Sequence, residues 1–216
     1  MNSPRTHRAA LADHSPSVRL RAALEAGTGA DPGLLEVLIE RCAVEPDFCV
    51  RDTLSWALTR LPARLTVPRL RAETRREQPQ AVAQALHTLS KIGDPDGWQA
   101  ITPAVLHAGD REVARSAWRA AVVLVPDDRR EWLASMLAAR LGRGDAETQR
   151  SVSRALVALG PAADAAIADA AGHPDGRVRV HARATRALAA DPDTGFDAAL
   201  TEARRLDALG FLAQGG

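Results

Sequence analysis

The sequence predicts an all-α protein, and three observations lead to this fold class. Alanine, a strong helix former, supplies 44 of the 216 residues. Residues that favour strands are scarce, because aromatic residues make up only 3% of the chain and tyrosine is absent. Finally, one short sequence pattern recurs along the chain at a nearly constant spacing, which is typical of repeat proteins.

The recurring pattern is a turn containing Asp, Pro or Gly, then Val, often Arg, and then a helix rich in Ala and Leu. Its valines stand at positions 18, 50, 82, 113 and 178, so the last spacing is about twice the others. The missing copy is the segment from Asp145 to Gly160, where Gln149 takes the place of the valine. The pattern therefore predicts six helices, one for each copy.

Each copy leaves room for a second helix. Residues 33–45 have apolar side chains at helical spacing, with Asp31-Pro32 before them and Glu45-Pro46 after them. The other second helices are expected at 67–78, 98–109, 129–142, 162–171 and 195–209. A hairpin of two such helices is too small to bury its own apolar face, so neighbouring hairpins are expected to stack.

The repeated turn, Val-Arg and helix resembles the HEAT-repeat family, especially the short HEAT-like units of the phycobilisome lyase type. The resemblance implies a right-handed α-solenoid of about six hairpins that forms a single domain over residues 16–209. Residues 1–15 and 210–216 are then expected to be flexible segments. Proteins of this family are commonly scaffolds that hold partners on a concave face, and a minority are enzymes or bind DNA.

Positions counted from the valine predict which side of each helix faces the core. Offsets 0, 4, 7 and 11 lie on one stripe, which in the second copy consists of Val50, Leu54, Ala57 and Leu61. Offsets 2, 5 and 9 point away from that stripe, toward the solvent side of a groove. The candidate partner-binding residues at these offsets are Gln84, His87, Lys91, Arg115, Trp118, Arg154 and Arg183.

This row is predicted to bind an acidic or amphipathic segment of a partner protein, because it carries four basic residues and Asp52 is its one acid. Arginine makes forked contacts with carboxylates, and tryptophan is frequent at binding hot spots. The alternative is that the arginines are merely solvated and Trp118 packs against a neighbouring helix. The second functional candidate, a nucleic-acid-binding relative of HEAT-like DNA glycosylases, is disfavoured by the net charge of only +1.

We expect no enzymatic activity, no cofactor and no metal. Cys42 and Cys49 flank a turn with no histidine close by in the sequence. No histidine is followed by glutamate, as in the HEAT-like hydroxylases that hold a di-iron centre. The HEAT-like DNA glycosylases carry an aspartate one turn after a groove tryptophan, whereas Val122 has that place after Trp118. A Gly-rich phosphate loop and a nucleophile elbow are also missing from the sequence.

A cytoplasmic location is expected from two further features of the sequence. The segment from Met1 to Leu20 has charged and polar residues throughout, without the apolar run of a signal peptide. No stretch is apolar enough over its length to form a transmembrane helix, so no membrane partner is expected.

Overall fold

The computed structural model describes the backbone of residues 4–214 and the side chains of residues 6–209. These residues form helices and no strands, which confirms the predicted all-α fold class. None of the described helices is both long and apolar enough to cross a membrane. The chain divides into two compact units, Met1–Leu124 and Val125–Gly216.

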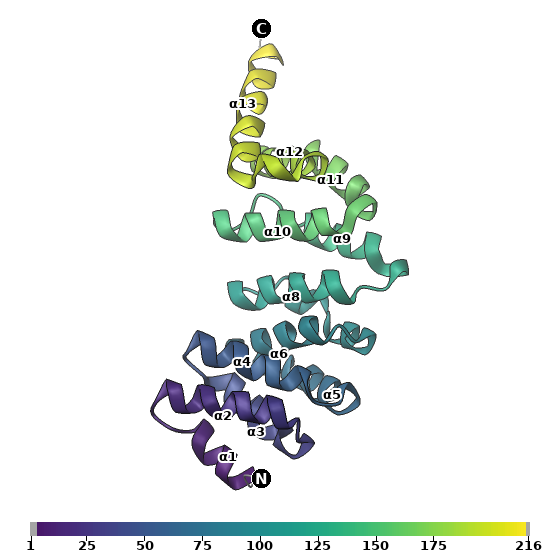
Figure 1. Cartoon of the computed structure of the whole chain (residues 1–216). Helices are drawn as coiled ribbons and strands as arrows, with labels where there is room; N and C mark the ends of the chain where they lie inside the picture. The colour runs from purple at the N-terminus through teal and green to yellow at the C-terminus, as the bar shows by residue number, and fades with distance from the viewer. Residues whose placement is uncertain (1–3, 215–216) are drawn as a thin grey trace. The chain divides into compact units, whose positions relative to one another are not determined.

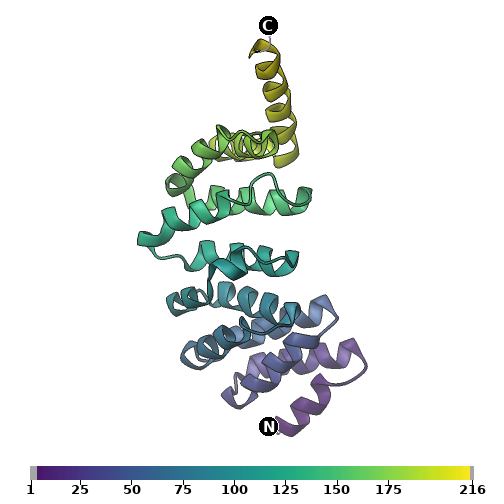
Figure 2. The same cartoon turned by 180° about the vertical axis from the view of Figure 1, so that it is seen from behind.

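The first unit consists of helices joined by short turns. They are α1 (Pro4–Leu11), α2 (Pro16–Gly29), η1 (Pro32–Leu34), α3 (Leu35–Val44), α4 (Phe48–Thr59), α5 (Ala63–Glu73), α6 (Pro79–Ile92), η2 (Pro95–Ala100), α7 (Pro103–Leu106) and α8 (Arg111–Leu124), where η marks a 3₁₀ helix. The helices that carry the repeated valine, α2, α4, α6 and α8, pack on one another in chain order (Figure 1). Helices α3, α5 and α7 pack against this layer, which Figure 2 shows from behind.

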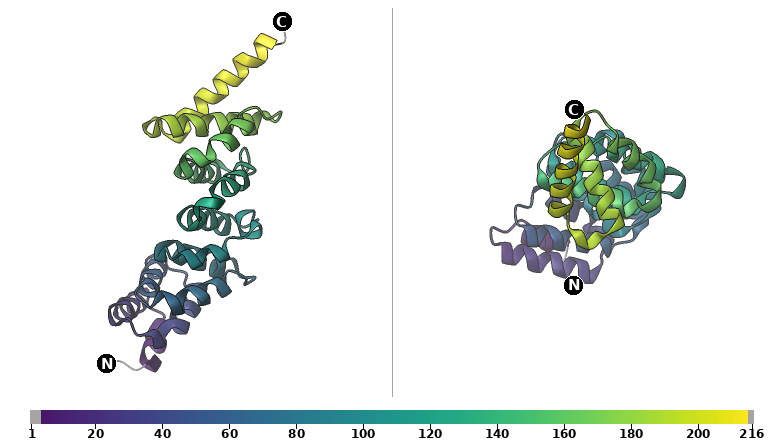
Figure 3. Two further views of the ribbon diagram at one scale, coloured as in Figure 1. Left: turned by 90° about the vertical axis from the view of Figure 1, so that its right-hand side faces the viewer. Right: turned by 90° about the horizontal axis from the view of Figure 1, so that it is seen from above.

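The second unit continues the same alternation. Its elements are η3 (Asp127–Arg129), α9 (Arg130–Ala138), α10 (Ala146–Leu159), η4 (Gly160–Ala163), α11 (Asp164–Ala171), α12 (Gly176–Ala190), η5 (Pro192–Thr194) and α13 (Phe196–Gln214). Helix α10 packs on α12, and α9 and α11 pack against them. Helix α13 packs on α12 through Phe196, Leu200 and small residues, and its later turns extend beyond α12 (Figure 3).

Two expected flexible segments contain helices. Residues 4–11 form α1, which packs on α2, and α13 continues through residues 210–214. The outermost parts of these segments, residues 1–3 and 215–216, lie outside the described residues. The boundaries of a single repeat domain at 16–209 stay a prediction.

The predicted core stripe is confirmed in the second copy. Val50, Leu54, Ala57 and Leu61 are all buried, with at most 5% of their surface exposed. The first copy differs, because Val18 is 41% exposed and its neighbour Arg19 is buried instead. Apolar periodicity alone could not predict this exchange, since the burial of Arg19 depends on a carboxylate from another helix.

That carboxylate belongs to Glu45, which is fully buried. Arg19 donates to it through Nε and Nη2, each at 2.8 Å, and Arg41 Nη2 lies 2.7 Å from the same group. The backbone N–H of Asp47 adds a further hydrogen bond at 2.9 Å. Burial raises the pKa of Glu45, but the hydrogen bonds from Arg19, Asp47 and Arg41 outweigh it and lower the pKa to about 2.

The arginine of the Val-Arg pattern has a structural role in three copies. In each, one Nη1 atom donates to two successive carbonyl oxygens of the preceding turn: Arg19 to those of Asp13 and His14, Arg51 to those of Glu45 and Pro46, and Arg179 to those of His173 and Pro174. These carbonyl groups have no partner within a helix, so the guanidinium supplies one. The arginine thereby ties the start of each helix to the turn before it.

Two of the expected second helices differ from the prediction. Helix α5 begins at Ala63, four residues early, and contains Pro68 in its interior. The segment expected at 98–109 forms only the short η2 and α7, because Pro103 disfavours helical geometry at the residue before it. Thr102 is accordingly extended, with φ −115° and ψ 159°.

Candidate functional site

Three predicted residues line one cavity of about 570 Å³ in the first unit. Gln84 and His87 come from α6, and Arg115 comes from α8. The beginnings of α4 and α6, and α8 from Asp110 before it to Arg119, form the rest of the wall. These residues meet because the three helices pack in the same register, so equal offsets from the valine fall on the same side.

Lys91, a fourth predicted residue, stands beside this cavity and neutralises one of its acids. Its Nζ lies 2.6 Å from Asp52 Oδ1, and its hydrogen bond lowers the pKa of Asp52. His87 Nε2 is 3.8 Å from the same oxygen. Burial lowers the pKa of His87, and the charges of Lys91 and Arg119 lower it further, against the opposite effect of Asp52. The ring of His87 is therefore neutral at pH 7.

Helix α8 contributes two arginines to the wall, and the sequence analysis identified one of them. Arg115 Nη1 pairs with Glu112 Oε1 at 3.3 Å. Arg119 Nη2 donates to Ser116 Oγ at 3.3 Å. A hydroxyl group does not neutralise a guanidinium, so Arg119 brings a positive charge to the cavity. Arg119 was not predicted because it stands six positions after Val113, between the offsets assigned to the groove.

An exposed aromatic ring lies at the rim. Phe48 is the first residue of α4, lines the cavity and is 72% exposed. The guanidinium carbon of Arg51 lies 5.9 Å from the ring centroid. Aromatic residues and arginine are both enriched in the contact surfaces between proteins. The sequence carried a signal for Phe48, because it directly follows Asp47, whose side chain caps α4 by accepting from Val50 N.

This cavity is less positively charged than the row of groove residues predicted from the sequence. Asp110 and Glu112 also line it, whereas the predicted row contained a single acid. Asp110 Oδ1 caps α8 by accepting from two backbone N–H groups, and Glu112 is paired with Arg115. The described hydrogen bonds of Arg51 and Arg119 go to neutral oxygens, so these two charges remain available to a ligand.

The prediction that Trp118 is a solvent-facing platform was wrong. Its side chain is 1% exposed, and its Nε1 donates to the carbonyl oxygen of Leu106 at 2.9 Å. The reason is the short α7 before it: where a full second helix was expected, α7 ends at Leu106 and the indole ring packs there. The alternative, that Trp118 packs against a neighbouring helix, is the correct one. Ser55, which follows Val50 at the same offset of five positions as Trp118 follows Val113, is also fully buried.

Arg154 and Arg183 belong to the second unit, which holds them at different places. Arg154 lines a cavity of about 340 Å³ together with Arg150 from the same helix. Arg183 Nη1 pairs with Asp207 Oδ1 at 2.9 Å, and Arg179 Nε pairs with the same oxygen at 2.6 Å. Arg183 does not line the cavity of Arg154.

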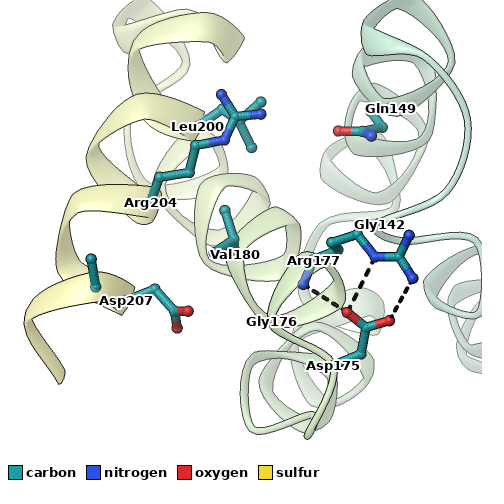
Figure 4. A pocket seen from close by; sticks show the side chains of 10 residues that line it. Gly142, Gln149, Asp175, Gly176, Arg177, Val180, Leu200, Arg204 and Asp207 are labelled. Carbon is teal, nitrogen blue, oxygen red and sulfur yellow. Dashed lines mark hydrogen bonds and ion pairs between the residues drawn. The ribbon is translucent and has the colours of Figure 1, made fainter. Parts of the chain in front are cut away.

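A larger cavity of about 800 Å³ in this unit lies between α12, α13 and the start of α10. Figure 4 shows Arg177 beside Asp175, to which its Nη2 is bound at 3.1 Å, and Arg204 and Leu200 on α13. Asp207 also lines it, and the hydrogen bond from Arg179 lowers the pKa of Asp207. Both acids of this cavity are held in ion pairs, Asp175 with Arg177 and Asp207 with Arg179 and Arg183.

The two cysteines are unpaired and differ in their surroundings. Cys42 is buried and Cys49 is exposed. Burial raises the pKa of Cys42 to about 12, so its thiol stays protonated and is a poor metal ligand. Among the residues that the structure describes, no three His, Cys, Asp or Glu side chains are grouped so that they could hold a metal ion.

Comparison with known proteins gives a likeness of fold. No family model and no curated protein sequence matches the chain. Among solved structures, an engineered protein matches with a TM-score of 0.52 and 20% identity, over 97% of this chain and 98% of that one. Human deoxyhypusine hydroxylase in complex with glycerol matches with a TM-score of 0.43 and 24% identity, over 87% of this chain and 73% of that one. The CpcE–CpcF complex of phycocyanin lyase from Nostoc sp. PCC7120 matches with a TM-score of 0.40 and 17% identity, over 96% of this chain and 94% of that one.

This comparison corrects one conclusion from the sequence. The expectation that the chain is not an enzyme is contradicted, because a hydroxylase and a lyase are among the proteins with a similar arrangement of helices. The missing motifs described above therefore do not exclude an activity. What the engineered protein has in common with this chain is the arrangement of its helices.

Proposed function

We propose that the cavity of the first unit binds an acidic segment of a partner protein, so that the chain acts as an adaptor or regulatory module. The observation that carries the proposal is the pair formed by Arg119 and Phe48. Arg119 has a charge that its hydroxyl partner does not neutralise, and Phe48 presents an exposed ring on the same cavity. A segment with a carboxylate next to an apolar side chain complements both features.

Two arginines of α8 would contact the carboxylates of such a segment. Arg119 needs to give up only a hydrogen bond to Ser116. Arg115 lines the same cavity and pairs with Glu112, whose side chain is 66% exposed. His87 is neutral and adds a hydrogen-bonding ring without opposing the charge of the ligand.

The experiment uses a fluorescently labelled peptide of alternating glutamate and leucine, with binding followed by fluorescence anisotropy. Arg119→Glu should weaken binding roughly tenfold or more, because a charge-assisted contact becomes a repulsion. Arg21→Glu is the matched control, since Arg21 is exposed on α2 and lines none of the described cavities. Phe48→Ala should weaken binding severalfold through lost apolar contact. Equal effects of Arg119→Glu and Arg21→Glu would contradict a specific site.

Nucleic acid, the second candidate, is tested in the same assay. A labelled duplex DNA should bind more weakly than the peptide at equal salt concentration, because the cavity offers two uncompensated arginines rather than an extended basic surface. Tighter binding of the duplex, with an affinity that falls steeply as salt rises, would overturn the proposal in favour of nucleic acid.

Several parts of the sequence-based hypothesis stay predictions alongside this proposal. They are the right-handed solenoid of six hairpins, the cytoplasmic location, and a role for Gln84, Lys91, Arg154 and Arg183 in binding a partner. Lys91 is the least suited of these to an acidic ligand, since its charge is held by Asp52.

A further inference from the structure

The second unit contains a small pocket whose wall combines two arginine side chains with apolar side chains. It measures about 340 Å³, at the lower end of the range of ligand sites in proteins. Helix α10 forms one side through Arg150 and Arg154. The end of α12 and the turn before α13 form the other side.

The two arginines of this pocket differ in what neutralises them. Arg150 Nη2 lies 2.9 Å and 3.0 Å from the two carboxylate oxygens of Asp197, and its guanidinium carbon lies 5.7 Å from the centroid of the Phe196 ring. Arg154 makes no hydrogen bond or ion pair with the described residues that would offset its charge. Because the two arginines are four residues apart on one helix face, they repel each other weakly. Since Arg150 is neutralised by Asp197, the pocket keeps one positive charge, that of Arg154.

Four apolar side chains, those of Val157, Leu188, Pro192 and Phe196, also line the pocket, and none of its lining residues among those that the structure describes is acidic. Phe196 is held firmly, since it is only 7% exposed and its ring packs edge-on against His181 at 5.6 Å between centroids. A rigid apolar wall beside one uncompensated guanidinium favours a ligand that has one negative charge and an apolar body.

We propose that this pocket binds a small monocarboxylate that carries an apolar group. The carboxylate accepts a forked pair of hydrogen bonds from Arg154, and the apolar group lies against Phe196 and Leu188. A phosphate dianion fits less well, because Arg150 is already neutralised by Asp197 and the lining has no further cation. The site lies wholly within the second unit and does not depend on the function proposed for the first.

Isothermal titration calorimetry with octanoate tests the proposal on the full chain. Octanoate should bind with a stoichiometry of one, whereas octylamine should not bind because it carries the wrong charge. Arg154→Gln should weaken octanoate binding roughly tenfold or more, since it removes the charge but keeps helix propensity. Arg186→Gln is the matched control, because Arg186 is exposed on α12 and does not line the pocket. Equal affinities of the wild type and Arg154→Gln would overturn the proposal.

A second pair of variants tests whether octanoate occupies this pocket, and both substitutions are at exposed positions outside the core. Ala158 is exposed and lines the pocket, so Ala158→Phe should fill it and abolish octanoate binding. Ala187→Phe places the same ring on an exposed position of α12 outside the pocket and should leave binding unchanged. Tighter binding of octyl phosphate than of octanoate would overturn the assignment of a carboxylate. Unchanged binding by Ala158→Phe would show that the ligand does not occupy this pocket.

Discussion

Replacing Glu45 by glutamine should strongly destabilise the first unit, although it changes only one carboxylate oxygen into an amide. Glu45 is fully buried and neutralises Arg19, which is itself only 5% exposed. The amide oxygen could replace Oε2, which accepts from both Arg19 and Arg41, but the amide NH2 group would then face Arg19 Nη2 and the Asp47 N–H, which are both donors. Breaking a buried ion pair by removing one partner costs about 3–5 kcal/mol, because a buried charge is left unpaired. Since one acceptor oxygen remains, we expect a loss of about 3 kcal/mol.

Urea denaturation followed by circular dichroism measures this loss. With a urea dependence of about 2 kcal/mol/M, the unfolding midpoint should fall by roughly 1.5 M. Glu40→Gln is the matched control, since the pair of Glu40 with Arg8 is exposed and should contribute about 1 kcal/mol or less. A loss below about 1 kcal/mol for Glu45→Gln would refute the reasoning.

The same carboxylate also predicts a pH dependence. Its pKa is about 2 in the folded protein and near 4.5 in the unfolded chain, so the unfolded state takes up a proton first as the pH falls. The stability that Glu45 contributes is complete above about pH 4.5 and is lost as the pH falls toward 2. Glu45→Gln should remove this part of the acid sensitivity.

Three further changes have expected outcomes. Trp118→Phe removes the hydrogen bond to Leu106 and leaves a buried gap, so it should lower the unfolding free energy by about 2 kcal/mol in urea titration; an unchanged midpoint would contradict the burial of the ring. Gly27→Ala places a Cβ in steric conflict with the ring of Trp56, so it should displace that half-exposed ring and shift the tryptophan emission to longer wavelength; an unaltered spectrum would contradict the contact. Burial lowers the pKa of His181 to about 4, whereas the pKa in the unfolded chain is about 6.5. The free energy of unfolding should therefore be highest above about pH 6.5 and fall by about 3 kcal/mol as the pH drops to 4, and His181→Gln should flatten that pH profile.

The fold class and the register of the helices could be predicted because they depend on neighbours in the sequence. The spacing of the valines placed α4, α6 and α8 correctly, and the buried stripe at Val50 follows directly from the helical period. The same register explains why Gln84, His87 and Arg115 meet in one cavity. Phe48 and Arg119 escaped prediction because they lie outside the offsets assigned to the groove.

The repeated arginine shows how far a pattern can be interpreted without coordinates. Its recurrence after the valine indicated a family resemblance, but not a purpose. The structure shows that Arg51 and Arg179 each bind two carbonyl oxygens five and six residues earlier in the chain. A pattern of this kind is local, so a structural explanation could have been proposed from the sequence. The recurrence of this arginine is therefore explained by the turn that it binds.

What the sequence determined by itself was the all-α fold class, the helices α4, α6 and α8 and the buried stripe of α4, since these follow from residues within a few positions of one another. Only the tertiary structure decided which charges remain uncompensated. Lys91 is neutralised by Asp52, 39 positions away, and Arg183 by Asp207, 24 positions away. The exposure of Trp118 likewise depended on where α7 ends. Partners brought together by folding, and not the residue types in a row, determine what a surface can bind.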